Sequence, residues 1–281
     1  MQLTRRGRLT VTLSVTVVLL AGITAYVLTR TSVGTALGVP VAPPPCTITV
    51  DGDTRDWSRQ QAMTATTVAW VGVRIGATVN GVAAAVETAL AGGSADVGTD
   101  PTAARAIYRA LPDRASPTPR SVALARALLG YEGRALTCTV AFGIGGGPPR
   151  EDPGSLGLTP RAETLRLAMR EVFGKQTLGG FEPKGVDSGH IQGSAHYEGR
   201  AIDVFFRPAT AENQQRGWAQ AHWAVAHAER LAVATVIFDR SVWSAHRSVS
   251  GWRDYHYPGG PTENPILLHE DHVHVDVVEG S

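Results

Sequence analysis

The alternation of apolar and polar residues separates one long apolar run at the N-terminus from two regions with shorter periodic segments. The run Leu9–Leu28 contains no charged residue, and Arg30 follows it. A helix of about twenty residues rises about 30 Å, which is the thickness of a bilayer hydrocarbon core. We therefore expect a transmembrane helix within residues 1–30.

The basic residues before this run indicate its orientation. Arg5, Arg6 and Arg8 favour a cytoplasmic N-terminus, because the cytoplasmic flanks of membrane spans are enriched in arginine and lysine. The alternative is a cleaved signal peptide, although the apolar region of such peptides has only about 7–15 residues. We expect a single-pass anchor in the cell membrane, with the bulk of the chain extracytoplasmic and an extended Pro-rich spacer at Thr31–Pro45.

The region after the spacer has a helical periodicity. Ser58 and Gln61 form a possible capping box, Asn80 is a possible cap, and Asp100 with Pro101 is typical of a helix start. The predicted helices are Ala62–Val73, Gly81–Ala91, Pro101–Leu111 and Ser121–Leu129.

Two cysteines lie at the ends of this helical region. Cys46 and Cys138 each begin a β-branched segment that is typical of a strand, Cys46–Val50 and Cys138–Phe142. An even number of cysteines in an exported chain favours one disulfide, and two free buried thiols are the alternative.

The C-terminal region combines helical and strand-like periods. A helix is predicted from Thr159–Pro160 to Phe173, and a strand, an amphipathic helix and a second strand follow at Ala201–Phe206, Asn213–Leu231 and Ala234–Phe238. The segment His272–Val278 alternates with a period of two. Its residues His272, His274 and Asp276 therefore share one face of a strand, opposite three valines.

These patterns predict an α+β protein in which a small antiparallel sheet carries the candidate site. The expected parts are a cytoplasmic tip and anchor (1–30), a spacer (31–45), a helical module (46–142), a Gly/Pro linker (143–157) and an α+β domain (158–281). The 281 residues are 43% hydrophobic and 18% charged, which is typical of a globular chain. The net charge of +1 gives no electrostatic argument for a nucleic-acid partner.

The candidate chemistry comes from two separated segments. His196 precedes Asp203 by seven residues, and Asp271-His272-Val-His274 supplies a later His-x-His. Imidazole nitrogen and carboxylate oxygen are ligands that Zn²⁺ readily takes, and three protein ligands leave a fourth position for water. If the segments meet in space, this pattern predicts a zinc hydrolase.

The residues Ser194, His196, Gly199, Ala201 and Asp203 fit the pattern Ser-x-His-x-x-Gly-x-Ala-x-Asp. The region from about Gly157 to Val278 thereby resembles the M15 metallopeptidases, which include D-alanyl-D-alanine carboxypeptidases, and the wider superfamily of lysostaphin-type endopeptidases and hedgehog domains. It also looks like the C-terminal domain of actinobacterial surface proteins. The resemblance implies that the zinc ligands are His196, Asp203 and His274.

The base that takes a proton from water remains open between two residues. In dipeptidases of this family a glutamate three residues before the last histidine has this role, and Asp271 holds that position here. Alternation places Asp271 on the far side of the strand from His274, whereas His272 lies on the same side. Related endopeptidases use the first histidine of His-x-His, so His272 is favoured.

Other residues near these motifs have weaker expected roles. Ser194 and Arg200 are candidates for substrate binding, and Asp276 is expected to orient a ligand histidine. His190 could line the site or be a loop histidine. Two further histidines, His222 and His227, are expected to pack within a helix, and His246, His256 and His269 to lie in loops. The aromatic residues Trp243, Trp252, Tyr255 and Tyr257 are expected in the core or along a substrate groove.

The region from Cys46 to about Leu111 distantly resembles the lysozyme-like transglycosylase modules of surface proteins. Those modules carry a catalytic glutamate after a helix, and Gly92 stands at that place here. Glu87 lies inside the predicted helix, where a solvated carboxylate is expected. Without the acid, protonation of a glycosidic oxygen has no donor, so the module is interpreted as a degenerate spacer or glycan-binding remnant.

The expected function is that of a membrane-anchored, extracytoplasmic zinc peptidase that hydrolyses peptidoglycan stem peptides. The substrate class follows from the resemblance and from the predicted export. The alternative is a peptidoglycan-binding or scaffold protein without catalytic activity.

Overall fold

The computed structural model describes residues 45–92, 95–112, 115–140 and 148–281. The predicted membrane span Leu9–Leu28 and all but the last residue of the spacer lie outside these ranges. Within them, no helix is both long enough and apolar enough to cross a membrane. The described residues belong to one compact unit. It is an α+β unit with two antiparallel sheets, which confirms the predicted α+β class and the antiparallel pairing.

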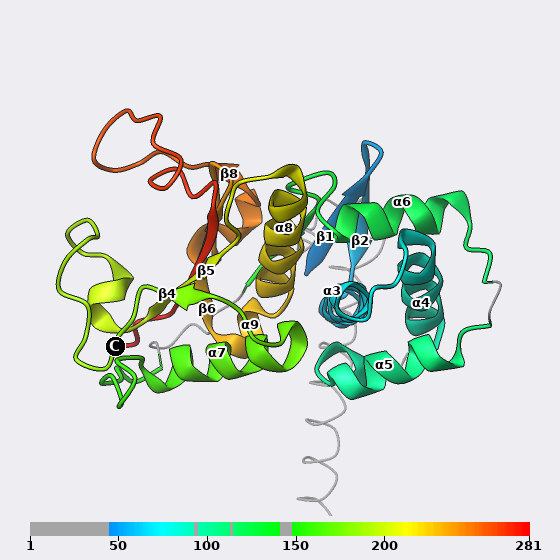
Figure 1. Cartoon of the computed structure of the whole chain (residues 1–281), viewed down its shortest axis with the longest axis horizontal. Coiled ribbons are helices and arrows are strands. Elements are labelled where there is room, and N and C mark those ends of the chain that lie inside the picture. Colours follow the sequence, from blue (N-terminus) through cyan, green and yellow to red (C-terminus); the bar gives the residue numbers. More distant parts are fainter. Residues whose placement is uncertain (1–44, 93–94, 113–114, 141–147) are drawn as a thin grey trace, which may run out of the picture. The chain divides into compact units, whose positions relative to one another are not determined.

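The first part of the unit pairs a small sheet with a group of helices (Figure 1). The sheet has the strand order β2-β1-β3. The elements are β1 (Cys46–Val50), β2 (Asp53–Trp57), α3 (Arg59–Arg74), α4 (Val79–Gly92), η1 (Ala95–Gly98), α5 (Pro101–Ala110), α6 (Pro119–Leu128) and β3 (Leu136–Cys138).

Side-chain caps explain where most of these helices begin. In α3 the Ser58 hydroxyl accepts from the Gln61 amide at 3.1 Å, and Gln61 accepts from the Ser58 amide at 2.8 Å, which confirms the capping box. Asp100 caps α5 ahead of Pro101, also as predicted. The predicted cap Asn80 is wrong. Helix α4 already begins at Val79, and the Thr78 hydroxyl accepts from the Gly81 amide at 3.2 Å instead.

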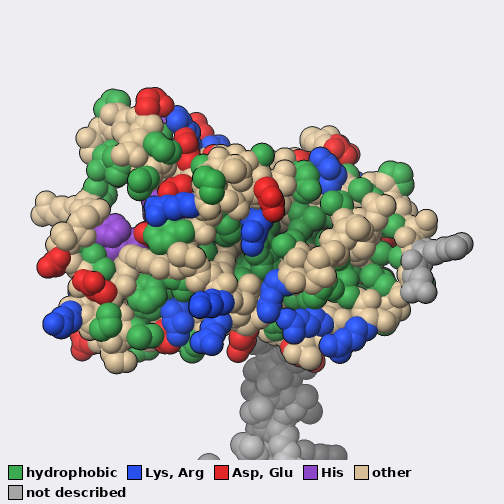
Figure 2. All heavy atoms as spheres, viewed as in Figure 1, with side chains coloured by type: hydrophobic (Ala, Val, Ile, Leu, Met, Phe, Trp, Pro, Cys, Tyr) green, Lys and Arg blue, Asp and Glu red, His purple; other side chains and the backbone are tan. Residues whose placement is uncertain are grey.

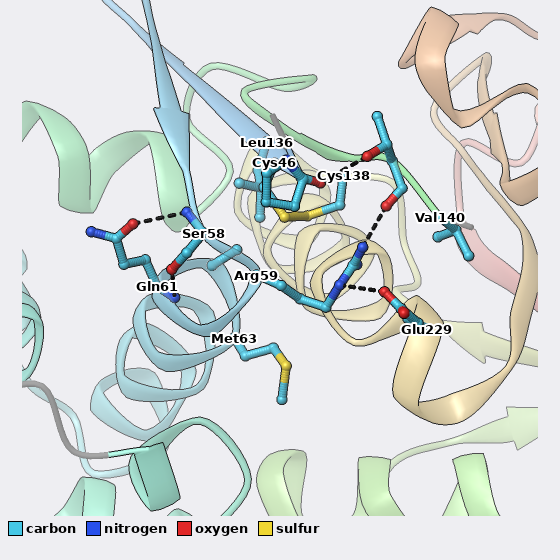
Figure 3. The surroundings of a disulfide bond; sticks show 12 residues. Cys46, Ser58, Arg59, Gln61, Met63, Leu136, Cys138, Val140 and Glu229 are labelled. Carbon is cyan, nitrogen blue, oxygen red and sulfur yellow. Dashed lines mark hydrogen bonds and ion pairs between the residues drawn. A yellow bond between two sulfur atoms is a disulfide. The ribbon is translucent and has the colours of Figure 1, made fainter. Parts of the chain in front are cut away.

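A disulfide joins Cys46 to Cys138, as expected (Figure 3). The two residues are direct partners in the antiparallel pair of β1 and β3, and both are buried. The predicted strand from Cys138 onward is placed wrongly, because β3 ends at Cys138 instead of beginning there. Beside the disulfide, Arg59 donates to the Thr139 carbonyl and pairs with Glu229 at 2.6 Å, which connects α3 to the C-terminal half.

The C-terminal half is built on a second sheet with the strand order β4-β5-β9-β6-β7-β8. Helices α7 and α8 pack against its central strands. The elements are α7 (Pro160–Phe173), β4 (Leu178–Gly179), η2 (Ala195–Glu198), β5 (Ala201–Phe205), α8 (Ala211–Ala226), α9 (Ala228–Leu231), β6 (Val233–Phe238), β7 (Ser241–Ser244), η3 (Ala245–Ser250), β8 (Arg253–Asp254) and β9 (His272–Val277).

The two halves share one hydrophobic core. The Phe173 ring makes edge contacts with Trp70 of α3 at 4.8 Å and with Trp223 of α8 at 5.0 Å between ring centroids. The indole of Trp243 donates to the carbonyl of Cys138 at 3.1 Å. The helical module therefore packs against the half that carries the candidate site and shares its hydrophobic core.

His227 is a second link between the halves and interrupts the helix predicted at Asn213–Leu231. It lies between α8 and α9 and is completely buried. Its ring nitrogens lie 2.8 Å from the Trp223 carbonyl and 2.9 Å from the Gly98 carbonyl of η1. Burial lowers the pKa of His227 to about 4, although the two carbonyls act in the opposite direction.

We expect this histidine to make the fold sensitive to acid. The unfolded chain takes up a proton on His227 near pH 6.5, whereas the folded chain takes it up only near pH 4. The stabilisation is therefore present above pH 6.5 and is lost as the pH falls towards 4. The maximum loss is about 3 kcal/mol. His227→Gln keeps a donor for a carbonyl and should reduce the pH dependence of the unfolding free energy between pH 6.5 and 4, measured by urea denaturation. An unchanged pH dependence would contradict this expectation.

Candidate metal centre

Three of the predicted site residues meet at one end of the second sheet. His196 lies in η2, Asp203 in β5 and His274 in β9. Asp203 and His274 are direct partners in the antiparallel pair of β5 and β9, so that their side chains project from the same face. The opposite face of β9 carries Val273 and Val275, which are fully buried. The alternation predicted for this strand is confirmed.

The three side chains place one ligand atom each at the corners of a small triangle. His196 Nε2 lies 3.0 Å from His274 Nδ1 and 3.2 Å from Asp203 Oδ1, and His274 Nδ1 lies 3.1 Å from Asp203 Oδ1. Tetrahedral zinc with bonds of about 2.0–2.1 Å holds its ligand atoms about 3.3–3.4 Å apart. Within the described ranges this is the group of three whose geometry suits a metal ion. The residues therefore fit zinc.

The hydrogen bonds on the outer sides of the two rings determine which nitrogens face inward as acceptors. His196 Nδ1 lies 2.7 Å from the Gly180 carbonyl, which can only accept, so Nδ1 carries the proton. His274 Nε2 lies 3.3 Å from Asp276 Oδ2, which likewise assigns its proton to Nε2. With the protons placed in this way, His196 Nε2, His274 Nδ1 and Asp203 Oδ1 are directed at one another, and a cation between them, either a proton on His274 or a metal ion, stabilises the arrangement. Asp276 lies where it can orient the His274 ring, which is the position expected for it.

The ionisation of this group also indicates a site for positive charge. Burial opposes ionisation of Asp203, but hydrogen bonds from His196 and His274 hold its pKa below the usual range. Burial disfavours the imidazolium form of His274, yet its hydrogen bonds with Asp203 and Asp276 raise its pKa to about 9. A metal ion would take the place of that proton, so binding would release it.

Both candidates for the base lie beside this triangle, and a hydrogen bond joins them. Asp271 Oδ1 accepts from His272 Nδ1 at 2.7 Å, and Arg207 Nε donates to the other carboxylate oxygen. His272 Nε2 lies 4.0 Å from Asp203 Oδ1 and faces the pocket. Burial opposes ionisation of Asp271, but hydrogen bonds from His272 and Arg207 lower its pKa below the usual range. In this arrangement Asp271 orients His272, whose Nε2 is free to accept a proton.

The two candidates for substrate binding have different positions. Ser194 lines the pocket, and its hydroxyl accepts from the His196 amide at 3.4 Å. Arg200 is turned away from the pocket. Its guanidinium donates to Glu198 at 2.6 Å and to the Val277 carbonyl at 2.8 Å, so the structure gives it a role in holding η2 beside β9.

The triangle lies at the bottom of a pocket of about 540 Å³ between two projecting loops. Figure 2 shows the histidine side chains in this hollow. One wall comes from residues 189–195 and includes His190, whose ring stacks on His196 at 4.0 Å. The opposite wall comes from residues 255–269 and includes Tyr255 and Tyr257. His190 and the two tyrosines therefore line the site, whereas Trp243 is part of the core.

Two residues of the site, His269 and Arg207, were not assigned to it from the sequence. His269, expected as a loop histidine, lines the pocket with its ring 4.7 Å from that of His272, and burial lowers its pKa to about 2. Arg207 reaches the site from just beyond β5, where its guanidinium lies 4.1 Å over the Phe205 ring. Neither position follows from periodicity, because both residues lie outside regular strands.

Gly180 is the backbone element on which the site depends most directly. Its φ is +78°, and a Cβ placed there would come within 2.2 Å of the His196 ring. We expect Gly180→Ala to displace His196 and to weaken zinc binding by roughly ten- to a hundredfold, as losses of supporting contacts around metal ligands do. Gly185→Ala is the matched control, since Gly185 also has a positive φ of +83° but has open space around it. Equal zinc affinity of the two variants in a chelator competition would contradict the role of Gly180.

Comparison with known proteins gives one match. Residues 154–266 match the family model described as VldE, C-terminal domain. The matched region is less than half of the chain; it contains His196 and Asp203 but ends before His272 and His274. No curated protein and no solved structure matches the chain. The resemblance to M15 metallopeptidases therefore stays a prediction that rests on the motif residues.

Proposed function

We propose that this protein is a zinc-dependent peptidase that acts outside the cytoplasm on peptides of the cell wall. The observation that carries the proposal is the triangle of His196 Nε2, Asp203 Oδ1 and His274 Nδ1, with edges of 3.0–3.2 Å, in a pocket that also contains His272. Three ligands of this kind leave a coordination position for water, as in catalytic zinc sites.

His196, Asp203 and His274 would hold the ion, and a bound zinc ion supplies a Lewis acid for a carbonyl oxygen and for water. His272 accepts the proton of the attacking water at Nε2. Asp271 holds the Nδ1 proton and stabilises the imidazolium that forms, in the same way that a carboxylate supports a catalytic histidine elsewhere. The proton is then available for the leaving amine.

The cell-wall substrate and the membrane anchor are further parts of the proposal. They are supported by the apolar run Leu9–Leu28, by the disulfide between Cys46 and Cys138, and by the resemblance of the motif residues. Disulfides persist mainly in oxidising compartments outside the cytosol. The peptides that cross-link the wall are a peptidase substrate in that location.

The test is incubation of the purified, zinc-loaded protein with muropeptides, followed by analysis of the products. We expect released D-alanine or new amino termini, with loss of turnover in EDTA and recovery on addition of zinc. Zinc-loaded protein that retains muropeptides without forming products would overturn the peptidase and would identify a binding protein instead. A protein that takes up no zinc would overturn the metal site as well.

A further inference from the structure

A second cavity, of about 250 Å³, lies in the helical module and is lined by residues of the β1–β2 hairpin and of the helices α4 and α6. Its walls are mainly apolar and are formed by the side chains of Ile48, Val50, Trp57, Leu90 and Leu124. None of its lining residues lines the pocket of the candidate metal centre. The proposed hydrolysis makes no use of it.

Two arginines stand at this apolar cavity. Arg55 is the direct partner of Ile48 in the hairpin and lies on the same inner face, and Arg120 lies in the first turn of α6. Among the described residues, no hydrogen bond or ion pair of either guanidinium group is found. Arg55 is half-buried and Arg120 is exposed, so both guanidinium groups are accessible to a ligand. A cation in the first turn of a helix is unfavourable, because the helix dipole is positive there, so an anion beside Arg120 would be favourable.

The acidic residue at the cavity does not supply that anion. Glu87 accepts a hydrogen bond from the Ser121 hydroxyl at 2.9 Å, and within the described ranges it forms no ion pair with either arginine. The cavity therefore combines an apolar interior with two guanidinium groups and one exposed carboxylate, Glu87, which leaves a net positive charge at the cavity. This combination is complementary to a ligand that has a single anionic group and an apolar body.

We propose that this cavity binds a short aliphatic carboxylate. The carboxylate would lie between Arg55 and Arg120, whose planar guanidinium groups suit a two-oxygen acceptor. The chain would extend along Val50, Trp57 and Leu124. The cavity volume is just below the roughly 300–1,000 Å³ of sites for drug-sized ligands, so the ligand is small. This site is independent of the proposed peptidase activity.

The test is calorimetric titration of residues 45–281, which belong to one compact unit with its own core, with butanoate, hexanoate and octanoate. We expect the affinity to rise about threefold to fourfold for each added methylene until the cavity is filled, because each buried methylene contributes about 0.8 kcal/mol. Hexanol and hexylamine should bind at least about tenfold more weakly than hexanoate. Equal binding of hexanoate and hexanol, or no saturable binding of hexanoate, would overturn the proposal.

Substitutions of the two arginines distinguish specific binding of hexanoate in this cavity from unspecific binding elsewhere on the protein. Arg55→Gln and Arg120→Gln should each weaken hexanoate binding about tenfold and leave hexanol binding unchanged. Arg109→Gln removes an exposed arginine from α5 that does not line the cavity and should leave hexanoate binding unchanged. Unaltered thermal unfolding of each variant establishes that it is folded. An equal loss of hexanoate binding in all three variants would overturn the proposal in favour of a general charge effect.

Discussion

Replacing His196 with alanine should give a folded protein that no longer retains zinc. The variant leaves Asp203 and His274 as the remaining ligands and removes His196 Nε2, which forms one corner of the triangle. Four-ligand zinc sites bind with about 10–16 kcal/mol, so the loss of one ligand should weaken binding by roughly two to three orders of magnitude. Hydrolysis of muropeptides should be lost together with the metal.

The measurement is the zinc content of the purified protein, together with zinc affinity in competition with a chromophoric chelator. His246→Ala is the matched control, because His246 is an exposed histidine that lies outside the pocket. We expect this control to retain about one zinc per chain. If His196→Ala and His246→Ala bound zinc equally well, the triangle would be a hydrogen-bonded cluster and not a metal site.

Part of the arrangement of the candidate ligands could be predicted from the sequence, because it depends only on the alternation of side chains along a strand. A strand alternates its side chains, so the spacing of His272, His274 and Asp276 alone predicts one shared face. The pairing of β5 with β9, which sets Asp203 opposite His274, does not follow from either segment alone. The resemblance of the motif residues named Asp203 and His274 as ligands of one ion, but the strand pairing itself was not predicted, since pairing across seventy residues is a property of the whole sheet.

Local chemistry predicted helix starts well where a side chain caps the backbone, as at Ser58 and Asp100. It predicted strand ends poorly. The hairpin between β1 and β2 turns at Asp51-Gly52, where φ is +50° and +83°. The Asp-Gly pair is a known signal for such a turn, and β2 could have been predicted from it.

The supporting residues of the metal centre could not be anticipated in the same way. Gly180 contacts His196 from a loop that precedes the motif, and Arg207 bonds Asp271 from a position sixty-four residues away in the chain. These contacts depend on how loops fold over a finished sheet. No periodic pattern encodes them, because loop residues do not repeat their environment.

The division of labour between His272 and Asp271 leads to the second large expected effect. The hydrogen bond between His272 Nδ1 and Asp271 Oδ1, at 2.7 Å, places His272 Nε2 toward the pocket and leaves Asp271 behind it. General-base catalysis contributes about 10²–10⁴-fold to the rate. We therefore expect His272→Gln to lower kcat by that factor while zinc binding is retained, since His272 lies outside the triangle of ligand atoms.

Asp271→Asn should have no larger an effect than His272→Gln if Asp271 acts through His272. An asparagine of the same shape can still lie beside the His272 ring but does not stabilise the imidazolium or hold its tautomer, and such a replacement lowers kcat by up to about 10⁴-fold. The measurement is kcat for both single variants and for the double variant, each loaded with one zinc per chain. When two residues act as a unit, the double variant should be no slower than His272→Gln alone. A loss of activity in Asp271→Asn that exceeds the loss in His272→Gln would instead identify Asp271 as the base, because its carboxylate would then be the group that takes the proton from water.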